Sequence, residues 1–298
     1  MSFHSKKSET FLRDASRALW HDETLWGVRM KRDKAVSAVP EWEELRDTAS
    51  NIKDYVLSNL PGLLAEFETN AVKNGTMVHW AADAGEFNAI IYNLLNSKSI
   101  TRVVKSKSML TEECSMNQYL EERGIEVVDT DLGERIIQFR HETPSHIVLP
   151  AIHLKREQIG ETFHKELGTA DGCSDPQILT SAAREHLRNK FLNAQAAVSG
   201  VNFAVAESGT VVVCTNEGNA DMGLNAAPIQ IHCMGIEKIV PGFRELAVFS
   251  RMLARNATGQ AVTTYTSHYT SPKKGGEMHI VILDNGRSRV LADPDLAE

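Results

Sequence analysis

The chain has 298 residues, of which 42% are hydrophobic and 24% are charged, and its formal net charge is −7. These values are typical of a globular protein that buries a sizeable core, as one large domain or as a domain with an appendage. Nucleic-acid-binding proteins usually show a basic patch or a high pI, so the acidic balance argues against that class. No apolar run approaches the ~20 residues of a membrane span, and the N-terminus lacks the apolar segment of a secretory signal. We therefore expect a cytoplasmic protein that binds neither nucleic acid nor membrane.

The first part of the chain is predicted to be helical. Residues 11–20 and 42–67 carry apolar side chains at helical spacing, with many charges between them. Pro40 stands just before the second segment, as in a first helical turn, and acidic residues follow it. The sequence thus predicts a helical extension over residues 1–70, followed by a main domain over residues 71–298.

From about residue 75 the pattern alternates between short apolar strands and helices. Strands that alternate with helices favour a mostly parallel sheet covered on both faces, and the strand-rich end implies an antiparallel portion. The expected helices cover residues 84–98, 108–123, 156–167, 175–197 and 243–255. The expected strands cover residues 76–81, 100–105, 125–129, 136–139, 146–151, 201–206, 210–215, 229–234, 239–240, 261–266, 279–284 and 290–291.

Two valine-rich strands around Ser208-Gly209 form the most informative stretch of the sequence. Their length and the glycine between them predict a hairpin with a tight turn. Polar residues cluster at the strand ends, namely Glu207, Thr210, Asn216, Glu217 and Asn219. This cluster predicts a ligand-binding edge, with Glu207 as the candidate catalytic group because burial at a strand end raises a carboxyl pKa. The alternative is that Glu207 accepts backbone N–H bonds and braces the turn.

A second candidate site follows the strand predicted over residues 100–105. Lys105, Ser106, Lys107 and Ser108 connect this strand to a helix, and open parallel sheets bind ligands beyond the carboxyl ends of their strands. Helix N-termini attract anions through free N–H groups, so the loop predicts a site for a carboxylate or a phosphate. The alternative is an ordinary helix cap with two exposed lysines.

His153 also follows a predicted strand, in the segment HIVLPAIH. A histidine there could serve a ligand or could be structural, and these alternatives have equal weight. Because the carboxyl ends of parallel strands gather at one edge, we expect the Lys105–Ser108 loop, His153 and the Glu207–Asn219 segment to line one pocket. Such a pocket would accept a small anionic or acyl ligand.

No metal site is expected from the cysteines, because Cys114, Cys173, Cys214 and Cys233 are far apart and form no CxxC motif. The phosphate-binding motifs GxxxxGK[ST] and GxGxxG are absent, as are the hydrolase motifs GxSxG and HExxH. Classical nucleotide-binding and hydrolase classes therefore lack their usual signatures.

Seven segments together resemble one known family. They are VVKSKSMLTEE, VDTDLGERIIQ, PSHIVLPAIH, NFAVAESGTVVVCTNEGN, MGIEKIVP, ATGQAVTTYTS and DNGRSRVLADP. With these segments the chain resembles the LUD-domain family, and within it the lactate-utilisation iron–sulfur subunits. The resemblance extends over nearly the whole chain, and the segments are long and occur in order.

The resemblance implies a fold of the NagB/RpiA/CoA-transferase type, which is a three-layer α/β/α sandwich. It also implies a part in the oxidation of L-lactate to pyruvate within a three-protein system. Such proteins continue past DNGRSRVLADP into a ferredoxin-like region, so [4Fe–4S] clusters are expected only in a region after residue 298 and no cofactor is expected in this chain. The loop NEGNADMG lacks the arginine that relatives usually carry soon after the second Asn. The positions that match the family motifs are Lys105, Lys107, His153, Glu207, Thr210, Asn216, Glu217 and Asn219.

Three functions from different classes are open at this point. The first is the LUD portion of a lactate-oxidising electron-transfer subunit, inactive alone and working with partner subunits. The second is a stand-alone acyl- or CoA-handling enzyme with Glu207 as the nucleophile. The third is a non-catalytic module that binds a ligand or docks partner subunits.

Overall fold

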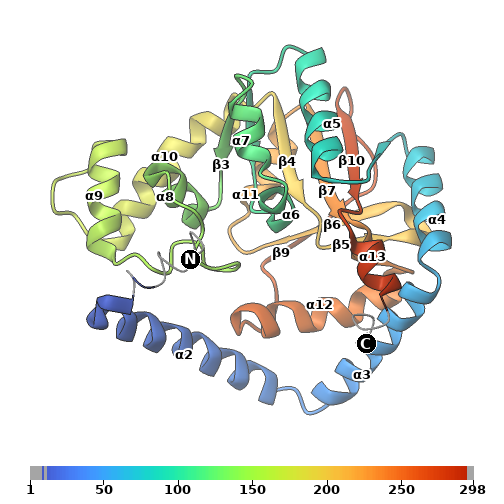
Figure 1. Cartoon of the computed structure of the whole chain (residues 1–298), viewed down its shortest axis with the longest axis horizontal. Helices are drawn as coiled ribbons and strands as arrows, with labels where there is room; N and C mark the ends of the chain where they lie inside the picture. Colours follow the sequence, from blue (N-terminus) through green and yellow to red (C-terminus); the bar gives the residue numbers. More distant parts are fainter. Residues whose placement is uncertain (1–8, 10–11, 294–298) are drawn as a thin grey trace.

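A six-stranded, fully parallel sheet forms the centre of the molecule (Figure 1). The structure is a computed structural model that describes residue 9 and residues 12–293. Short strands rich in Val, Ile and Ala form this sheet because such side chains fit a surface buried on both faces. In spatial order the strands are β1 (Met77–Ala81), β10 (Glu277–Leu283), β7 (Ile229–Gly235), β4 (Ala196–Gly200), β2 (Arg102–Lys105) and β3 (Glu126–Asp129).

The alternation of side chains along each strand builds a core on each face of this sheet. In β10, Val281 and Leu283 face one core, whereas Ile280 and Ile282 face the other. The first core is covered by α5 (Ala84–Ser97), α6 (Met109–Glu113) and α7 (Met116–Glu121). The second is covered by α4 (Leu60–Lys73), α10 (Pro176–Leu192), α11 (Asn219–Ala226) and a small second sheet.

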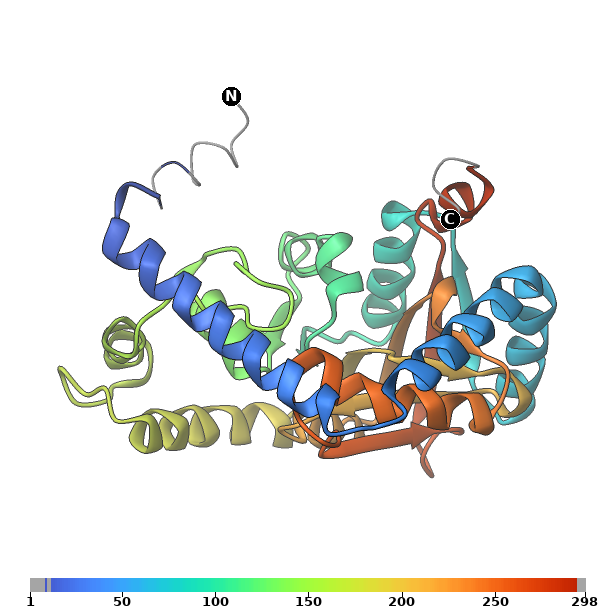
Figure 2. The same cartoon turned by 90° about the horizontal axis from the view of Figure 1, so that it is seen from below.

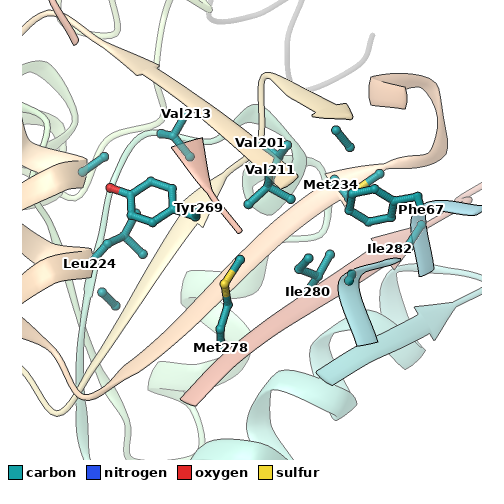
Figure 3. Packing of buried hydrophobic residues seen from close by; sticks show 14 of the residues in the cluster. Phe67, Val201, Val211, Val213, Leu224, Met234, Tyr269, Met278, Ile280 and Ile282 are labelled. Atoms are coloured by element: carbon teal, nitrogen blue, oxygen red, sulfur yellow. The ribbon is translucent and has the colours of Figure 1, made fainter. Parts of the chain in front are cut away.

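The small sheet has four strands and packs against the large one. Figure 3 shows side chains of both sheets meeting there, among them Val211, Met234 and Ile280, together with Phe67 of α4. Its outer face packs against α12 (Phe243–Thr258) through Phe203, Val212 and Leu246. In spatial order the strands are β8 (Ile239–Val240), β5 (Phe203–Val205), β6 (Thr210–Thr215) and β9 (Tyr265–Tyr269).

Two groups of helices lie outside these layers. Beyond β3, α8 (Leu132–Arg140), α9 (Arg156–Leu167) and α10 share a core of their own (Figure 1). Near the N-terminus, α2 (Ala15–Ser37) ends beside α12 (Figure 2), where Arg255 donates to the carbonyl of Ala35 (3.1 Å). It is followed by α3 (Trp42–Ser58), and α13 (Arg287–Ala292) is the last helix described. No helix in the described part of the chain is long and apolar enough to cross a membrane.

The predicted α/β fold, with a mostly parallel central sheet flanked by helices, is confirmed. The first 70 residues are helical where the structure describes them, and residue 11 lies outside the described part. The boundary at residue 70 stays a prediction: α4 crosses it and places Phe67 and Ala71, each 0% exposed, in the main core.

Three predicted strands are wrong, and two further predicted elements are present with other bounds. Residues 136–139 belong to α8, because Asp131 caps this helix by accepting from the N–H of Glu134 (3.1 Å). Residues 290–291 belong to α13 rather than to a strand, and residues 146–151 form turns. The helix predicted over 175–197 ends at Leu192, and the buried strand β4 follows it. The strand expected over residues 261–266 is β9, which begins four residues later, at Tyr265.

Candidate functional site

A pocket of about 750 Å³ lies beyond the carboxyl ends of β2, β4 and β7. This is the edge at which open parallel sheets bind ligands, since the loops that leave neighbouring strands diverge there. One wall is the loop of Ser106, Lys107 and Ser108 after β2, and another is the Asn216–Asn219 segment before α11. Residues 147–152 and the C-terminal half of α12 close the remaining sides.

The loop after β2 is held close to β4. Ser106 donates its N–H to the carbonyl of Val198 (3.0 Å), and the Ser108 hydroxyl caps α6 by accepting from the N–H of Thr111 (3.4 Å). A Cβ atom at Gly200 would lie only 2.7 Å from Ser108 Oγ. The absence of a side chain at Gly200 therefore lets the serine pack against the end of β4 at the pocket wall.

Lys107 joins two walls of the pocket. Its ammonium group donates to the carbonyl of Val148 (2.9 Å) and lies 3.6 Å from the carboxylate of Asp131. It therefore holds the 147–152 segment against the loop after β2. A bound anion would have to compete with both partners for this ammonium group.

Charged groups that line the pocket are nearly balanced. They comprise three cations and four carboxylates: Lys107, Lys238, Arg287, Glu113, Asp131, Glu217 and Glu237. Arg287 pairs with Glu113 (2.9 Å) and Glu237 (2.7 Å), and its hydrogen bond holds the pKa of Glu113 below its usual value. Every lining cation thus has a carboxylate partner, which suits a ligand of low charge better than a polyphosphate.

Lys105 does not line this pocket, contrary to expectation. The residue is 0% exposed, and its ammonium group lies 2.8 Å from Glu112, 2.9 Å from Asp129 and 3.6 Å from Glu134. An isolated buried ammonium is costly, so these carboxylates explain why a lysine is tolerated there.

Glu207 and Thr210 also lie outside the pocket lining. Glu207 accepts the N–H of Phe243 (2.9 Å), so it accepts a backbone N–H as the alternative interpretation expected, but it braces the start of α12 rather than its own turn. Thr210 is 1% exposed, and its hydroxyl bonds with those of Ser208 (2.8 Å) and Thr270 (2.9 Å). The expected common pocket therefore includes neither of them, and a catalytic role for Glu207 stays a prediction.

His153 does not line the pocket, contrary to expectation, although it directly follows the segment 147–152 that forms one wall. Its Nδ1 lies 2.7 Å from the Ser145 hydroxyl, and its Nε2 lies 2.9 Å from the carboxylate of Glu142. Burial raises the pKa of the Glu142 carboxyl, but the hydrogen bonds from His153 and Arg140 lower it by more. The net pKa is below its usual value, so Glu142 stays ionised. Sequence reasoning missed Ser145 and Glu142, although both stand in the same short segment ETPSHIVLPAIH.

Asn216, Glu217 and Asn219 line the pocket, as predicted from the sequence. Sequence reasoning missed the contribution of α12, whose small residues Ala254 and Ala257 leave room at the mouth. Cys214 lines the pocket too, and burial raises its pKa to about 11, so it is a neutral thiol rather than a nucleophile near pH 7. Among the described residues, no three His, Cys, Asp or Glu side chains are placed to hold a metal ion.

The chain is similar to a family model, to curated proteins and to a solved structure. The family model named LUD domain matches residues 64–290. The chain is 43% identical over 271 residues to the uncharacterized electron transport protein YkgF of Escherichia coli, covering 89% of this chain and 57% of that protein. It is 42% identical over 271 residues to lactate utilization protein B of Bacillus subtilis, covering 89% of this chain and 56% of that protein. A solved structure of a DUF162 family protein from Deinococcus radiodurans aligns with a TM-score of 0.43 at 11% identity, over 75% of this chain and 98% of that one.

The chain spans somewhat more than half the length of the curated relatives that it matches. The match of the family model extends from α4 to α13 and thus includes both sheets and every wall of the pocket. The chain therefore belongs to the LUD domain family.

Proposed function

We propose that this chain is the LUD portion of a lactate-utilisation electron-transfer protein and that its pocket binds a small anionic or acyl ligand of that pathway. Partner subunits would carry out the oxidation of L-lactate to pyruvate together with it in the cytoplasm. Support for the pathway comes from relatives named lactate utilization protein B and electron transport protein YkgF. Any [4Fe–4S] clusters would be held in a region outside residues 1–298.

The observation that carries the ligand-binding part is the position of the pocket. It opens where the ends of three parallel strands, the start of α11 and the Lys107 ammonium group come together. Free N–H groups in the first turn of a helix and a lysine both favour an acidic group on the ligand. The balanced lining argues that only one such group is bound, since each further anion would face Glu113, Asp131 or Glu217.

Growth on L-lactate tests the proposal in the organism that carries the gene. Deletion of the gene should abolish growth on lactate but not on glucose, and the intact gene should restore it. Ala257→Trp fills the pocket mouth from an exposed position on α12, so it should fail to restore growth. Ala247→Trp is the matched control, because Ala247 is exposed on the same helix but does not line the pocket. Growth of the deletion strain on lactate would contradict the pathway, and full rescue by Ala257→Trp would contradict the pocket.

A second candidate function, acyl transfer, is favoured by the contacts of His153. Ser145, His153 and Glu142 form a nucleophile–base–carboxylate chain, in which the exposed Ser145 hydroxyl would turn from the carbonyl of Pro150 (3.0 Å) to His153. In such a reaction the Ser145 oxygen would bond to the acyl carbon while its proton passes to His153 Nδ1. The leaving group would depart with that proton, and water would then release the acid and restore the hydroxyl. This arrangement replaces Glu207 as the nucleophile of the acyl-handling alternative.

Labelling with a fluorophosphonate probe distinguishes the two candidates. Acyl-transfer chemistry at Ser145 should give one adduct by intact mass, lost in Ser145→Ala and retained in Ser271→Ala, where Ser271 is another exposed serine. Absence of labelling in the wild-type protein would contradict acyl transfer. The contact between Ser145 and His153 would then serve only to hold the pocket wall.

A further inference from the structure

Four charged side chains meet behind the Ser106–Ser108 wall of the pocket. Lys105 stands at the end of β2, Asp129 at the end of β3, Glu112 on α6 and Glu134 on α8. The ammonium group of Lys105 lies within 3.6 Å of a carboxylate oxygen of each of the other three. We call these four residues the Lys105 cluster.

The cluster has more acidic groups than its single cation can neutralise. Three ionised carboxylates around one ammonium would leave two negative charges in the protein interior. Asp129 and Glu134 are 5% and 4% exposed, so water does little to stabilise them. Burial of unneutralised charge is costly enough that a group takes up a proton instead.

The surroundings of each carboxylate indicate which one carries that proton. Asp129 also accepts from the side-chain amide of Asn117 (3.0 Å), and Glu112 lies closest to the ammonium (2.8 Å) with 29% of its side chain exposed. Glu134 lies farthest from Lys105 (3.6 Å), and its Oε2, like Oδ1 of Asp129, has no hydrogen-bond partner. Burial raises the pKa of Glu134 to about 8; the charge of Lys105 opposes this rise, and the charges of Asp129, Asp131 and Glu112 support it.

We propose that Glu134 holds an exchangeable proton at the pocket wall, and that Lys105 and Glu112 connect it to solvent. The charged groups that face Glu134 are Lys105 from β2, Asp129 from β3, Glu112 from α6 and Asp131 at the start of its own helix. Gly133, its neighbour in α8, lines the pocket. Exchange consists of one proton leaving the carboxylic acid to give the carboxylate, with the ammonium of Lys105 unchanged.

The proton on Glu134 would take part in the oxidation of lactate, and this part of the inference rests on the proposed function. Oxidation of a 2-hydroxy acid to a 2-oxo acid releases two electrons and two protons. The electrons pass to the electron-transport partner that the proposed function already includes. A carboxyl group that holds a proton near neutral pH can release it to solvent through the cluster, and the carboxylate so formed can then take up one of the protons of the reaction without a large cost in free energy. Glu134 would act through the cluster and without contact to the ligand.

Infrared spectroscopy of the ligand-free protein tests the protonation directly. The wild type should show the carbonyl band of a buried carboxylic acid at pH about 6.5, and this band should disappear with a midpoint near pH 8. Glu134→Gln should remove the band, whereas Glu43→Gln, at an exposed position on α3, should retain it. Absence of the band from the wild type near pH 6.5, or its persistence in Glu134→Gln, would overturn the proposal.

The pH dependence of unfolding is a second, independent measurement. Glu134 has a higher pKa folded than unfolded, so the folded protein binds one proton more than the unfolded chain between pH about 4.5 and 8. As the pH rises across that range, the wild type should therefore lose stability relative to Glu134→Gln, with a slope of about one proton, and the difference should be constant above pH 8. Parallel curves throughout would show that Glu134 titrates normally and would contradict the proposal.

Rescue of growth on lactate separates this inference from the proposed function. Glu134→Gln protein that folds but supports slower growth would agree with proton exchange in the reaction, and undiminished growth would contradict that use. If Ala257→Trp fails to restore growth but the wild type shows no infrared band, the proposed function stands and the proton site is rejected. If the wild type shows the infrared band but the deletion strain still grows on lactate, the proton site stands and the proposed function is rejected.

Discussion

Two regions of the molecule are similar in sequence but occupy different environments in the structure. The Lys105–Ser108 loop and the Glu207–Thr210 turn each place charged and hydroxyl residues at the ends of buried apolar strands. The first forms a wall of the pocket through Ser106, Lys107 and Ser108. The second lies outside the pocket, and its glutamate holds the start of α12.

The difference follows from the way the strands pair. In the large sheet the strands are parallel, so the chain leaves β2, β4 and β7 at the same edge and the loops leave a hollow there. In the small sheet β5 and β6 are antiparallel, so the chain turns back within a few residues. Polar groups of the turn then bond locally, as when the Ser208 hydroxyl donates to that of Thr210 (2.8 Å). In this chain the polar residues that follow the parallel strand β2 line the pocket, whereas those in the turn between β5 and β6 do not.

The largest expected effect separates the two lysines of the first region. Lys105→Met leaves Asp129 and Glu134 buried without a cation, so the free energy of unfolding should fall by about 3–5 kcal/mol. Lys107→Met removes a side chain that is 30% exposed, and the loss should be about 0–1 kcal/mol. Urea unfolding of both variants measures the difference. Equal losses would mean that the buried cluster and the pocket wall are not distinct environments.

A medium effect is expected in the second region, where Gly209 packs tightly against α4. Gly209 has a φ of +67°, and a Cβ atom there would lie 2.2 Å from the backbone nitrogen of Ala71. Gly209→Ala should therefore lower the free energy of unfolding by about 2–4 kcal/mol. Gly275 has a φ of +75° with no atom within 4 Å of such a Cβ, so Gly275→Ala should cost only about 1–2 kcal/mol of backbone strain. Equal costs measured by thermal unfolding would show that the turn does not depend on its packing.

The smallest effect concerns the two helix caps, one in each region. Glu207→Ala removes an acceptor at the start of α12, and Ser108→Ala removes one at the start of α6, each worth about 0.5–2 kcal/mol. Only Ser108 lines the pocket. Calorimetric titration with L-lactate and pyruvate should therefore give altered binding in Ser108→Ala and unaltered binding in Glu207→Ala. Loss of binding in Glu207→Ala alone would restore Glu207 as a site residue.

Local patterns in the sequence were sufficient for most elements of the fold. Asp175-Pro176 predicts the start of α10, where the Asp175 carboxylate accepts from the N–H of Gln177 (2.8 Å). The apolar runs of β6, β7 and β10 are recognisable because each is long enough to be a strand between turn-forming residues. Positions beside strand ends and helix starts likewise predicted six residues that line the pocket, namely Ser106, Lys107, Ser108, Asn216, Glu217 and Asn219.

Other features depended on the tertiary structure. The small residues of β4 resemble a continuation of α10, and only pairing with β2 and β7 makes them a strand. Lys105 and Lys107 are alike in the sequence, but side chains two residues apart diverge once a strand ends and a loop begins. Lys105 contacts three carboxylates from other elements, whereas Lys107 lines the pocket. The sequence by itself determined most of the elements because apolar spacing and helix capping are local, whereas burial and charge pairing join residues distant in the chain and were decided only by packing.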